Sequence, residues 1–321
     1  MKSTLIAIIS AAILSLTDSH AADKVTVRFG HFPNVTHAQG VIAHAFSRQG
    51  KGWFEQRLGP NVEIQWFTYN AGPSAMEAVF AGSLDVTYVG TGPALNAHFK
   101  SDGAEIRVIS GAANGGAALV VKPDGGINSP KDFRGKKIAT PQLGNTQDIA
   151  CRAWLKAQGF RVTQTGGDVL VIPTANPDQL ALFKSGGVDA VWTVEPWVSR
   201  LEKEASAKVF LEDRDVITTW LISSTKFLNE HRDLAKKIAE ANKELTQWIK
   251  AHPAEAQSML VNELKAETRT EVAADSVSRS LERINLTDEV SPGLVQKAVN
   301  DSKDAGFSKG ASDISKLVAS P

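Results

Sequence analysis

The residues with the clearest chemical meaning are Thr91, Gly92 and Pro93, which directly follow a run typical of a β-strand over 84–89. Glycine in a tight turn and proline early in a helix predict that a helix begins here. A helix that starts at the carboxyl end of a strand is a common ligand site in α/β proteins, and its unpaired N–H groups favour anions. This turn therefore predicts an anion-binding site.

A second helix start lies just before that strand. Gly72, Pro73 and Ser74 begin it, and the apolar residues that follow have the spacing of one helical face. The stretch 69–95 thus has the order helix, strand, helix, with glycines at the joins. The rest of the chain is best understood around this stretch.

The same arrangement recurs over 179–197. In both segments a glycine precedes an aspartate that begins a strand, and the strand runs into a proline at a helix start. These positions are Gly82, Asp85 and Pro93 in the first segment, and Gly186, Asp189 and Pro196 in the second. The recurrence fits two similar lobes that face one another, although any two βα units share such a pattern.

The N-terminal residues predict export. Lys2 precedes an apolar run over 5–16, and Ser19-His20-Ala21 has a small-residue cleavage pattern. The run is too short to span a membrane, so residues 1–21 are expected to be a signal peptide and the mature chain to begin near Ala22. No later stretch is apolar enough for a span, so the protein is expected in the periplasm.

Charge and cysteine content exclude several classes of function. The chain has 35 basic and 35 acidic residues, which argues against nucleic acid or an anionic membrane as a partner. Cys151 is the only cysteine, and it is expected to be a buried structural thiol rather than a nucleophile. A lone cysteine cannot form an internal disulfide.

Alternating strands and helices predict an α/β fold with largely parallel sheets. About 300 mature residues are enough for two domains, or for one domain with a deep cleft. The element order predicts a first lobe over 22–111 plus 216–321 and a second lobe over 112–215 inserted into it. The glycine-rich segment 111–116 is expected to cross between the lobes, and the chain after Thr225 is expected to be helical.

Five segments give the chain a more specific resemblance: GHFPNVT at 30–36, the stretch 69–94, SPKDFRGKKIAT at 129–140, LGNTQDIACRAWLKAQG at 143–159 and GGVDAVWTVEPW at 186–197. Together with the signal peptide, they resemble periplasmic solute-binding proteins of the nitrate, taurine and sulfonate ABC importer family, most closely the aliphatic sulfonate binders. The resemblance covers 25–211. It implies the two-lobe periplasmic binding protein (type 2) fold, with the ligand in a cleft between the lobes.

The resemblance also implies which loops meet the ligand. The residues carried over are Phe32, Asn34 and His37 in the first loop, Ala71 and Gly72, Thr91 and Gly92, Asn114 and Gly115, and Asn145, Thr146 and Gln147. The asparagines and Thr91 are also plausible helix caps. Glu195 could contact the ligand or only satisfy a helix dipole, and Trp192 and Trp220 could wall the cleft or belong to the core.

The loops carry no Arg or Lys. Helix N-termini and neutral donors suit a sulfonate, whereas a phosphate monoester usually recruits Arg or Lys. His31, His37 and His44 could indicate a metal, but no third type of ligand clusters with them in the sequence, so neither a metal site nor a cofactor is expected.

The leading functional hypothesis is a monomeric binding protein, not an enzyme, that delivers a small organic anion to an ABC permease in the inner membrane. Its ligand is expected to be an aliphatic sulfonate or taurine-like compound, with nitrate or a thiamine-type pyrimidine precursor as alternatives. A precursor-synthesising enzyme of the same fold is an alternative of another class, which the single cysteine and the export signal disfavour. A transcription regulator lobe is disfavoured by the signal peptide.

Overall fold

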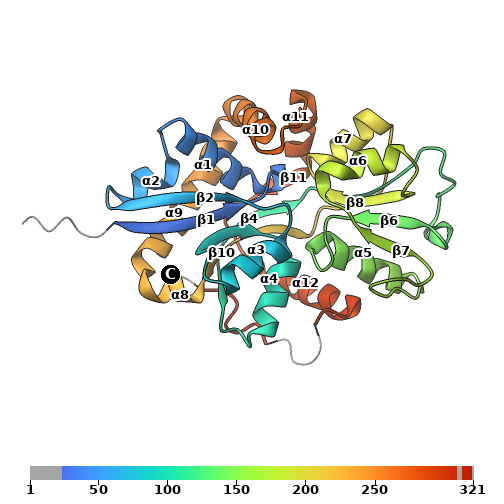
Figure 1. Cartoon of the computed structure of the whole chain (residues 1–321), viewed down its shortest axis with the longest axis horizontal. Coiled ribbons are helices and arrows are strands. Elements are labelled where there is room, and N and C mark those ends of the chain that lie inside the picture. The colour runs from blue at the N-terminus through green and yellow to red at the C-terminus, as the bar shows by residue number, and fades with distance from the viewer. Residues whose placement is uncertain (1–23, 309–312, 320–321) are drawn as a thin grey trace, which may run out of the picture.

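The structure is a computed structural model that describes residues 24–308 and 313–319, so the predicted signal peptide over 1–21 lies outside the described residues. Two β-sheets lie one after the other along the long axis, each with helices on both faces (Figure 1). The α/β class and the two-lobe architecture agree with the prediction. Among the described residues, no helix has the length and apolar character needed to cross a membrane.

The first sheet has six strands in the order β11-β4-β10-β3-β1-β2. Their bounds are β1 (Val25–His31), β2 (Val62–Thr68), β3 (Val86–Val89), β4 (Ile106–Gly115), β10 (Ile217–Ser224) and β11 (Ile284–Leu286). β1 runs parallel to both β2 and β3, while β10 is antiparallel to β3 and β4. The carboxyl ends of three parallel strands therefore meet at one edge.

The second sheet has five strands in the order β7-β6-β8-β5-β9. Their bounds are β5 (Ala117–Val121), β6 (Lys137–Thr140), β7 (Leu170–Pro173), β8 (Ala190–Val194) and β9 (Lys208–Asp213). As in the first sheet, three parallel strands are followed by an antiparallel strand. This shared order confirms the predicted repeat.

The two repeat aspartates have equivalent structural roles. Asp85 accepts a hydrogen bond from the backbone N–H of Arg28 at 2.9 Å, and Asp189 accepts one from that of Lys137 at 2.8 Å. Each carboxylate thereby joins the start of one parallel strand to its neighbour. Both aspartates precede the starts of strands, at the opposite ends from the strand ends that face the other lobe.

Helices connect and cover the strands. They are η1 (Val35–His37), α1 (Ala38–Arg48), α2 (Trp53–Leu58), α3 (Gly72–Phe80), α4 (Thr91–Lys100), η2 (Pro130–Phe133), α5 (Thr146–Ala157), α6 (Asn176–Lys184), α7 (Trp197–Ala205), α8 (Thr225–Glu230), α9 (Arg232–Ala251), α10 (Pro253–Thr268), α11 (Ala274–Arg283) and α12 (Pro292–Ala305). Their starts follow local rules. Ser129 and Asp132 form a capping box at η2, and Asn145 caps α5 by accepting from Asp148 N at 2.8 Å.

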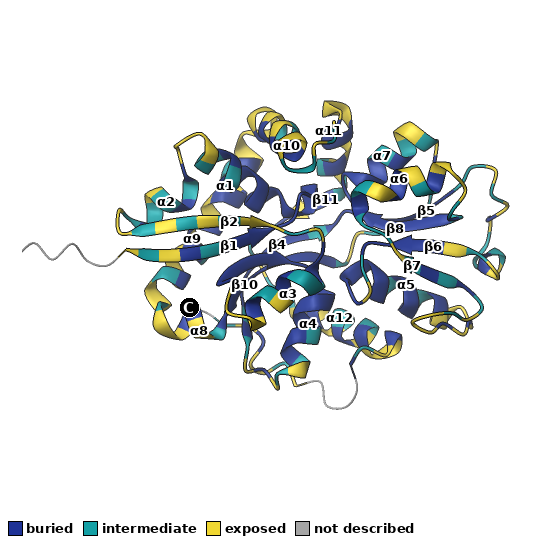
Figure 2. Ribbon diagram, in the orientation of Figure 1, coloured by how far each residue is buried: buried dark blue, intermediate teal, exposed yellow. Residues whose placement is uncertain are grey.

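Each lobe has its own core, seen as the buried strands and inner helix faces in Figure 2. In the first lobe, Phe29 and Tyr88 pack under α1, α9 and α10. In the second, Leu119 and Phe133 pack with the buried Cys151. Burial raises the pKa of the Cys151 thiol, so this residue is the unreactive core thiol that was predicted.

The chain passes between the sheets twice, after Gly115 and again between Asp213 and Ile217. The predicted lobe boundary at residue 112 falls inside β4, because residues 113–115 continue the strand and pair with β11. Gly115 has a positive φ of 73°, and a Cβ there would lie 2.7 Å from the carbonyl oxygen of Arg283. Glycine is therefore required where the chain leaves the first sheet.

α12 belongs to the C-terminal segment but contacts both lobes. Its residues Val295 and Val299 pack in the first-lobe core, whereas Ala305, followed by Phe307, packs on Ile149 of α5. Figure 1 shows α12 beside α4 and α5. This helix thus links the two lobes in addition to the two chain crossings.

Candidate ligand-binding site

A cavity lies where the strand ends of the two sheets face each other. The first lobe lines it with Phe32, Asn34, Thr36, His37, Asn70, Ala71, Gly72, Gly90, Pro93 and Thr218, and the second with Pro141, Asn145, Thr146, Gln147, Asn176 and Val194. All of these side chains are uncharged, unless His37 is protonated. The volume is about 20 Å³, on the order of one or two water molecules.

Helix N-termini from both lobes meet at this cavity. Ala71 and Gly72 begin α3, and Gly90 is the N-cap of α4. Asn145 is the N-cap of α5, and Asn176 is the first residue of α6. Since the first N–H groups of a helix lack partners within it and carry partial positive charge, the four termini favour an anion between them.

The α5 cap leaves a donor for the cavity. Asn145 Oδ1 accepts from Asp148 N, and Asn145 Nδ2 donates to Gln147 Oε1 at 2.9 Å. The side-chain oxygen of Gln147 thereby already has a hydrogen-bond partner. Its amide N–H groups have no partner among the described residues, so they remain available for a ligand oxygen.

His37 is buried and neutral. Its Nδ1 accepts a hydrogen bond from the backbone N–H of Phe32 at 3.3 Å, so the ring hydrogen is on Nε2. Burial lowers the pKa of His37 well below its usual value, and the neighbouring His31 lowers it further, while Glu267 opposes the shift. The imidazole therefore contributes a neutral donor and not a counter-charge.

We expect the affinity for a sulfonate to be nearly flat between pH 5.5 and pH 8. The lining contains no Asp, Glu, Lys or Arg, and the lowered pKa of the buried His37 favours its neutral form. Calorimetric dissociation constants at the two pH values, repeated with His37→Gln, provide the test. An affinity that falls steeply as pH rises, and does so only in the wild type, would show that His37 carries the positive charge.

Hydrogen bonds join the lobes around the cavity. The backbone N–H of Gly92 in α4 donates to Thr146 Oγ1 in α5 at 3.1 Å. Trp197 Nε1 donates to Asn34 Oδ1 at 2.7 Å, and Val35 N donates to the carbonyl oxygen of Glu195 at 3.0 Å. Together with the small volume, these contacts show that the lobes are closed.

Of the residues that the resemblance implied, eight line the cavity: Phe32, Asn34, His37, Ala71, Gly72, Asn145, Thr146 and Gln147. Thr91 and Gly92 instead border a second small cavity between α4, α5 and α12. Asn114 and Gly115 pair with β11 and lie outside the lining. The crossing is therefore a strand, whereas we expected a ligand loop.

Glu195, Trp192 and Trp220 also lie outside the lining. The fully buried Glu195 carboxylate accepts hydrogen bonds from Arg283 Nη1 and Ser280 Oγ, each at 2.9 Å. Burial raises the pKa of Glu195, and the bonds from Arg283 and Ser199 oppose this shift. Trp192 packs in the second-lobe core and Trp220 in the first-lobe core, so the core interpretation of both tryptophans is correct.

Comparison with known proteins identifies the family. The model of the NMT1-like family matches residues 20–262. The chain belongs to the NMT1-like family. It is 26% identical over 270 residues to a putative aliphatic sulfonates-binding protein of Bacillus subtilis, covering 82% of this chain and 77% of that protein. It is also 26% identical over 228 residues to the taurine-binding periplasmic protein of Escherichia coli, covering 68% of each.

The fold of this NMT1-like chain matches that of solved binding proteins. The alkanesulfonate-binding protein SsuA from Xanthomonas axonopodis pv. citri, solved with bound MOPS, superposes with a TM-score of 0.71 at 19% identity. The match covers 88% of this chain and 93% of that one. The likeness establishes the periplasmic binding protein fold.

Several cavity residues of the NMT1-like chain were missed from the sequence. Asn176 follows β7 as Ala71 follows β2, so applying the internal repeat to the second lobe would have found it. Thr36 and Asn70 adjoin residues that were found. Thr218 is on β10, and no local signal marks it, because only the pairing of β10 with β3 and β4 brings it to the cavity.

Proposed function

We propose that this NMT1-like protein is the substrate-binding component of an ABC importer and captures a small organic anion, of the aliphatic sulfonate class, between its lobes. The observation that carries the proposal is the cavity lining, in which four helix N-termini and neutral side chains converge. The names of its relatives, an aliphatic sulfonates-binding protein and a taurine-binding protein, support the same class of ligand.

The lining favours a weakly basic anion with several oxygens. A sulfonate stays singly charged at every physiological pH and accepts hydrogen bonds through three oxygens, which suits amide and backbone donors. A phosphate monoester dianion usually requires Arg or Lys, and the lining has neither. No carboxylate, thiol or amine lines the cavity, and its remaining reactive groups are the hydroxyls of Thr36, Thr146 and Thr218 and the imidazole of His37.

The cellular setting is part of the proposal. The predicted signal peptide over 1–21 places the mature chain in the periplasm, where a monomer would deliver its ligand to an inner-membrane permease. The named relatives, one of them periplasmic, support this setting. Movement of the lobes about the two crossings would load and release the ligand.

A small inorganic oxyanion such as nitrate is a second candidate ligand. The observation that favours it is the cavity volume of about 20 Å³, which suits a compact anion without a tail. A longer alkyl tail would require the lobes to stand further apart. Both candidates belong in the same binding panel.

We expect ethanesulfonate to bind at least tenfold more tightly than taurine, a difference of about 1.4 kcal/mol. The two ligands differ by the ammonium group of taurine, and the lining contains no carboxylate to pair with it. Titration calorimetry with ethanesulfonate, taurine, nitrate and ethyl phosphate is the test. If taurine binds more tightly than ethanesulfonate, the predicted selectivity is wrong. If none of the four anions binds, the proposed function is wrong.

A further inference from the structure

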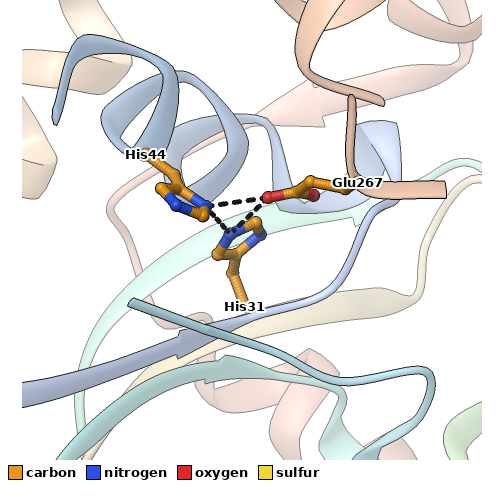
Figure 3. Close-up of side chains that lie close together, drawn as sticks. All are labelled: His31, His44 and Glu267. Carbon is orange, nitrogen blue, oxygen red and sulfur yellow. Dashed lines mark hydrogen bonds and ion pairs between the residues drawn. The ribbon is translucent and has the colours of Figure 1, made fainter. Parts of the chain in front are cut away.

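A cluster of metal-ligating groups lies outside the cavity, inside the first lobe (Figure 3). His31 is the last residue of β1, His44 is in α1 and Glu267 is in α10. His31 Nε2 lies 3.0 Å from His44 Nδ1 and 3.0 Å from Glu267 Oε1, and His44 Nδ1 lies 2.8 Å from the same oxygen. Three potential ligand atoms thus form a nearly equilateral triangle.

From the sequence we expected no metal site, because no third type of ligand clusters with the histidines. This cluster shows that the reason was wrong. The third type of ligand is present, but Glu267 is 223 positions after His44 and comes from a helix of the C-terminal segment. His37, which was grouped with the other two histidines, does not join them, because its Nδ1 accepts from Phe32 N. Only the tertiary fold brings the three ligands together.

Each way of placing hydrogen bonds in this triangle leaves one unfavourable contact. A ring nitrogen either carries a hydrogen and donates, or presents a lone pair and accepts. If both nitrogens donate to Glu267 Oε1, the two N–H groups converge on that oxygen from nitrogens only 3.0 Å apart, which brings two positively polarised hydrogens close together. If one nitrogen accepts from the other, its lone pair faces an ionised oxygen at 2.8 or 3.0 Å. A cation at the centre would accept a lone pair from all three atoms and remove the conflict.

Two further observations favour a cation. The second carboxylate oxygen of Glu267 is buried and has no hydrogen-bond partner among the described residues, and the side chain is only 1% exposed. His31 Nδ1 lies 3.4 Å from the carbonyl oxygen of Phe32, which allows this nitrogen to keep the ring hydrogen and leaves Nε2 free as a ligand. Histidines that bind metal usually donate their other ring N–H in this way.

We propose that His31, His44 and Glu267 bind one divalent transition-metal ion, with zinc as the best match to the donor set. Two imidazole nitrogens and a carboxylate oxygen are a common zinc ligand set, with a water molecule at the fourth position. Bonds of about 2.0 Å would place tetrahedral ligands about 3.3 Å apart, so the side chains need to separate by only a few tenths of an ångström.

The position of the proposed metal site, within the first lobe and outside the cavity, indicates a structural role. The metal would join β1, α1 and α10, and so fasten the C-terminal segment to the start of the fold. His31 directly precedes Phe32, whose backbone N–H donates to His37 in the cavity. None of the three ligands lines the cavity, so the metal would stabilise the first lobe and its cavity loop without touching the organic anion.

The test is zinc titration of chelator-treated, tag-free protein, followed by calorimetry and by thermal unfolding. One zinc ion should bind per chain and raise the midpoint of unfolding by several degrees, and cobalt in its place should give the visible absorption of a tetrahedral site. His44→Gln and Glu267→Gln should each weaken zinc binding roughly a hundredfold and abolish the thermal shift. Glu267→Gln preserves shape, and circular dichroism of the metal-free variants checks their folding.

His98→Gln is the matched control. His98 is also buried in the first lobe, but its Nε2 contacts the carbonyl oxygen of Asp313 at 2.9 Å, away from the cluster. This variant should bind zinc as the wild type does. Failure of the wild type to bind zinc stoichiometrically would overturn the proposal, as would unchanged binding by folded His44→Gln or Glu267→Gln. Ethanesulfonate affinity, measured in parallel, tests the cavity separately.

Discussion

Replacing Arg283 with Met is expected to lower the free energy of unfolding by about 3 kcal/mol or more. The carboxylate of Glu195 is fully buried, and Arg283 is its cationic partner at 2.9 Å. Arg283 also bonds to both oxygens of Glu202, at 2.7 and 3.1 Å. Removing one member of a buried ion pair leaves an uncompensated charge, which typically costs about 3–5 kcal/mol.

Urea unfolding at pH 7 measures this effect. Arg279→Met is the matched control, because Arg279 is on the same helix and contacts Glu202 at 3.8 Å, but is 49% exposed. An exposed pair of this kind contributes about 0–1 kcal/mol. Adding Glu195→Gln to Arg283→Met should restore most of the stability, since the buried charge is then removed. If Arg283→Met and Arg279→Met lower the free energy of unfolding equally, this explanation is wrong.

Replacing Gly92 with Val is expected to weaken ligand binding at least a hundredfold while the protein remains folded. A Cβ on Gly92 would lie 2.7 Å from Ile149 Cδ1 and 3.1 Å from the backbone nitrogen of Thr146, both in the other lobe. A valine therefore prevents closure and breaks the hydrogen bond from Gly92 N to Thr146 Oγ1. From the sequence we expected Gly92 to contact the ligand directly, whereas the structure attributes the effect of this substitution to contact between the lobes.

Calorimetry with the best ligand from the panel gives the affinity, and small-angle scattering with and without that ligand reports closure. The wild type should contract on binding, and Gly92→Val should not. Gly293→Val is the control, because Gly293 is likewise the second residue of a helix, and a Cβ there meets no atom within 4 Å. Wild-type affinity in folded Gly92→Val would show that closure does not depend on this contact.

Local patterns predicted the fold well where strands and helices alternate. The Thr91-Gly92-Pro93 turn and the Asn145 cap identified two helix starts that the structure confirms, because each is determined by neighbouring residues. The internal repeat, with Asp85 and Asp189 in matching places, predicted two similar sheets. These signals were sufficient to locate the cavity between the strand ends.

Features that depend on distant partners could not be predicted in this way. The extension of β4 through Gly115 requires β11, which comes from a segment expected to be helical. Trp220 is in the core, whereas Thr218, two residues earlier on the same strand, reaches the cavity because it lies at the start of β10, where the chain returns from the second lobe. Glu267 joins His31 and His44 only after α10 has packed against α1.

The pairing of β4 has a consequence for how the chain folds as it is made. The second sheet uses only strands between Ala117 and Asp213, so it is complete once this continuous segment has been synthesised. β4 cannot complete its pairing until β10 and β11 have been synthesised. The backbone of Val108 in β4 also forms hydrogen bonds with Leu317 and Ala319, near the end of the chain. Such long-range closure is slow, because distant segments must meet before any contact is gained. We therefore expect the inserted lobe to fold first, and a ribosome-bound chain truncated before Ile284 to carry a finished second lobe beside an unfinished first one.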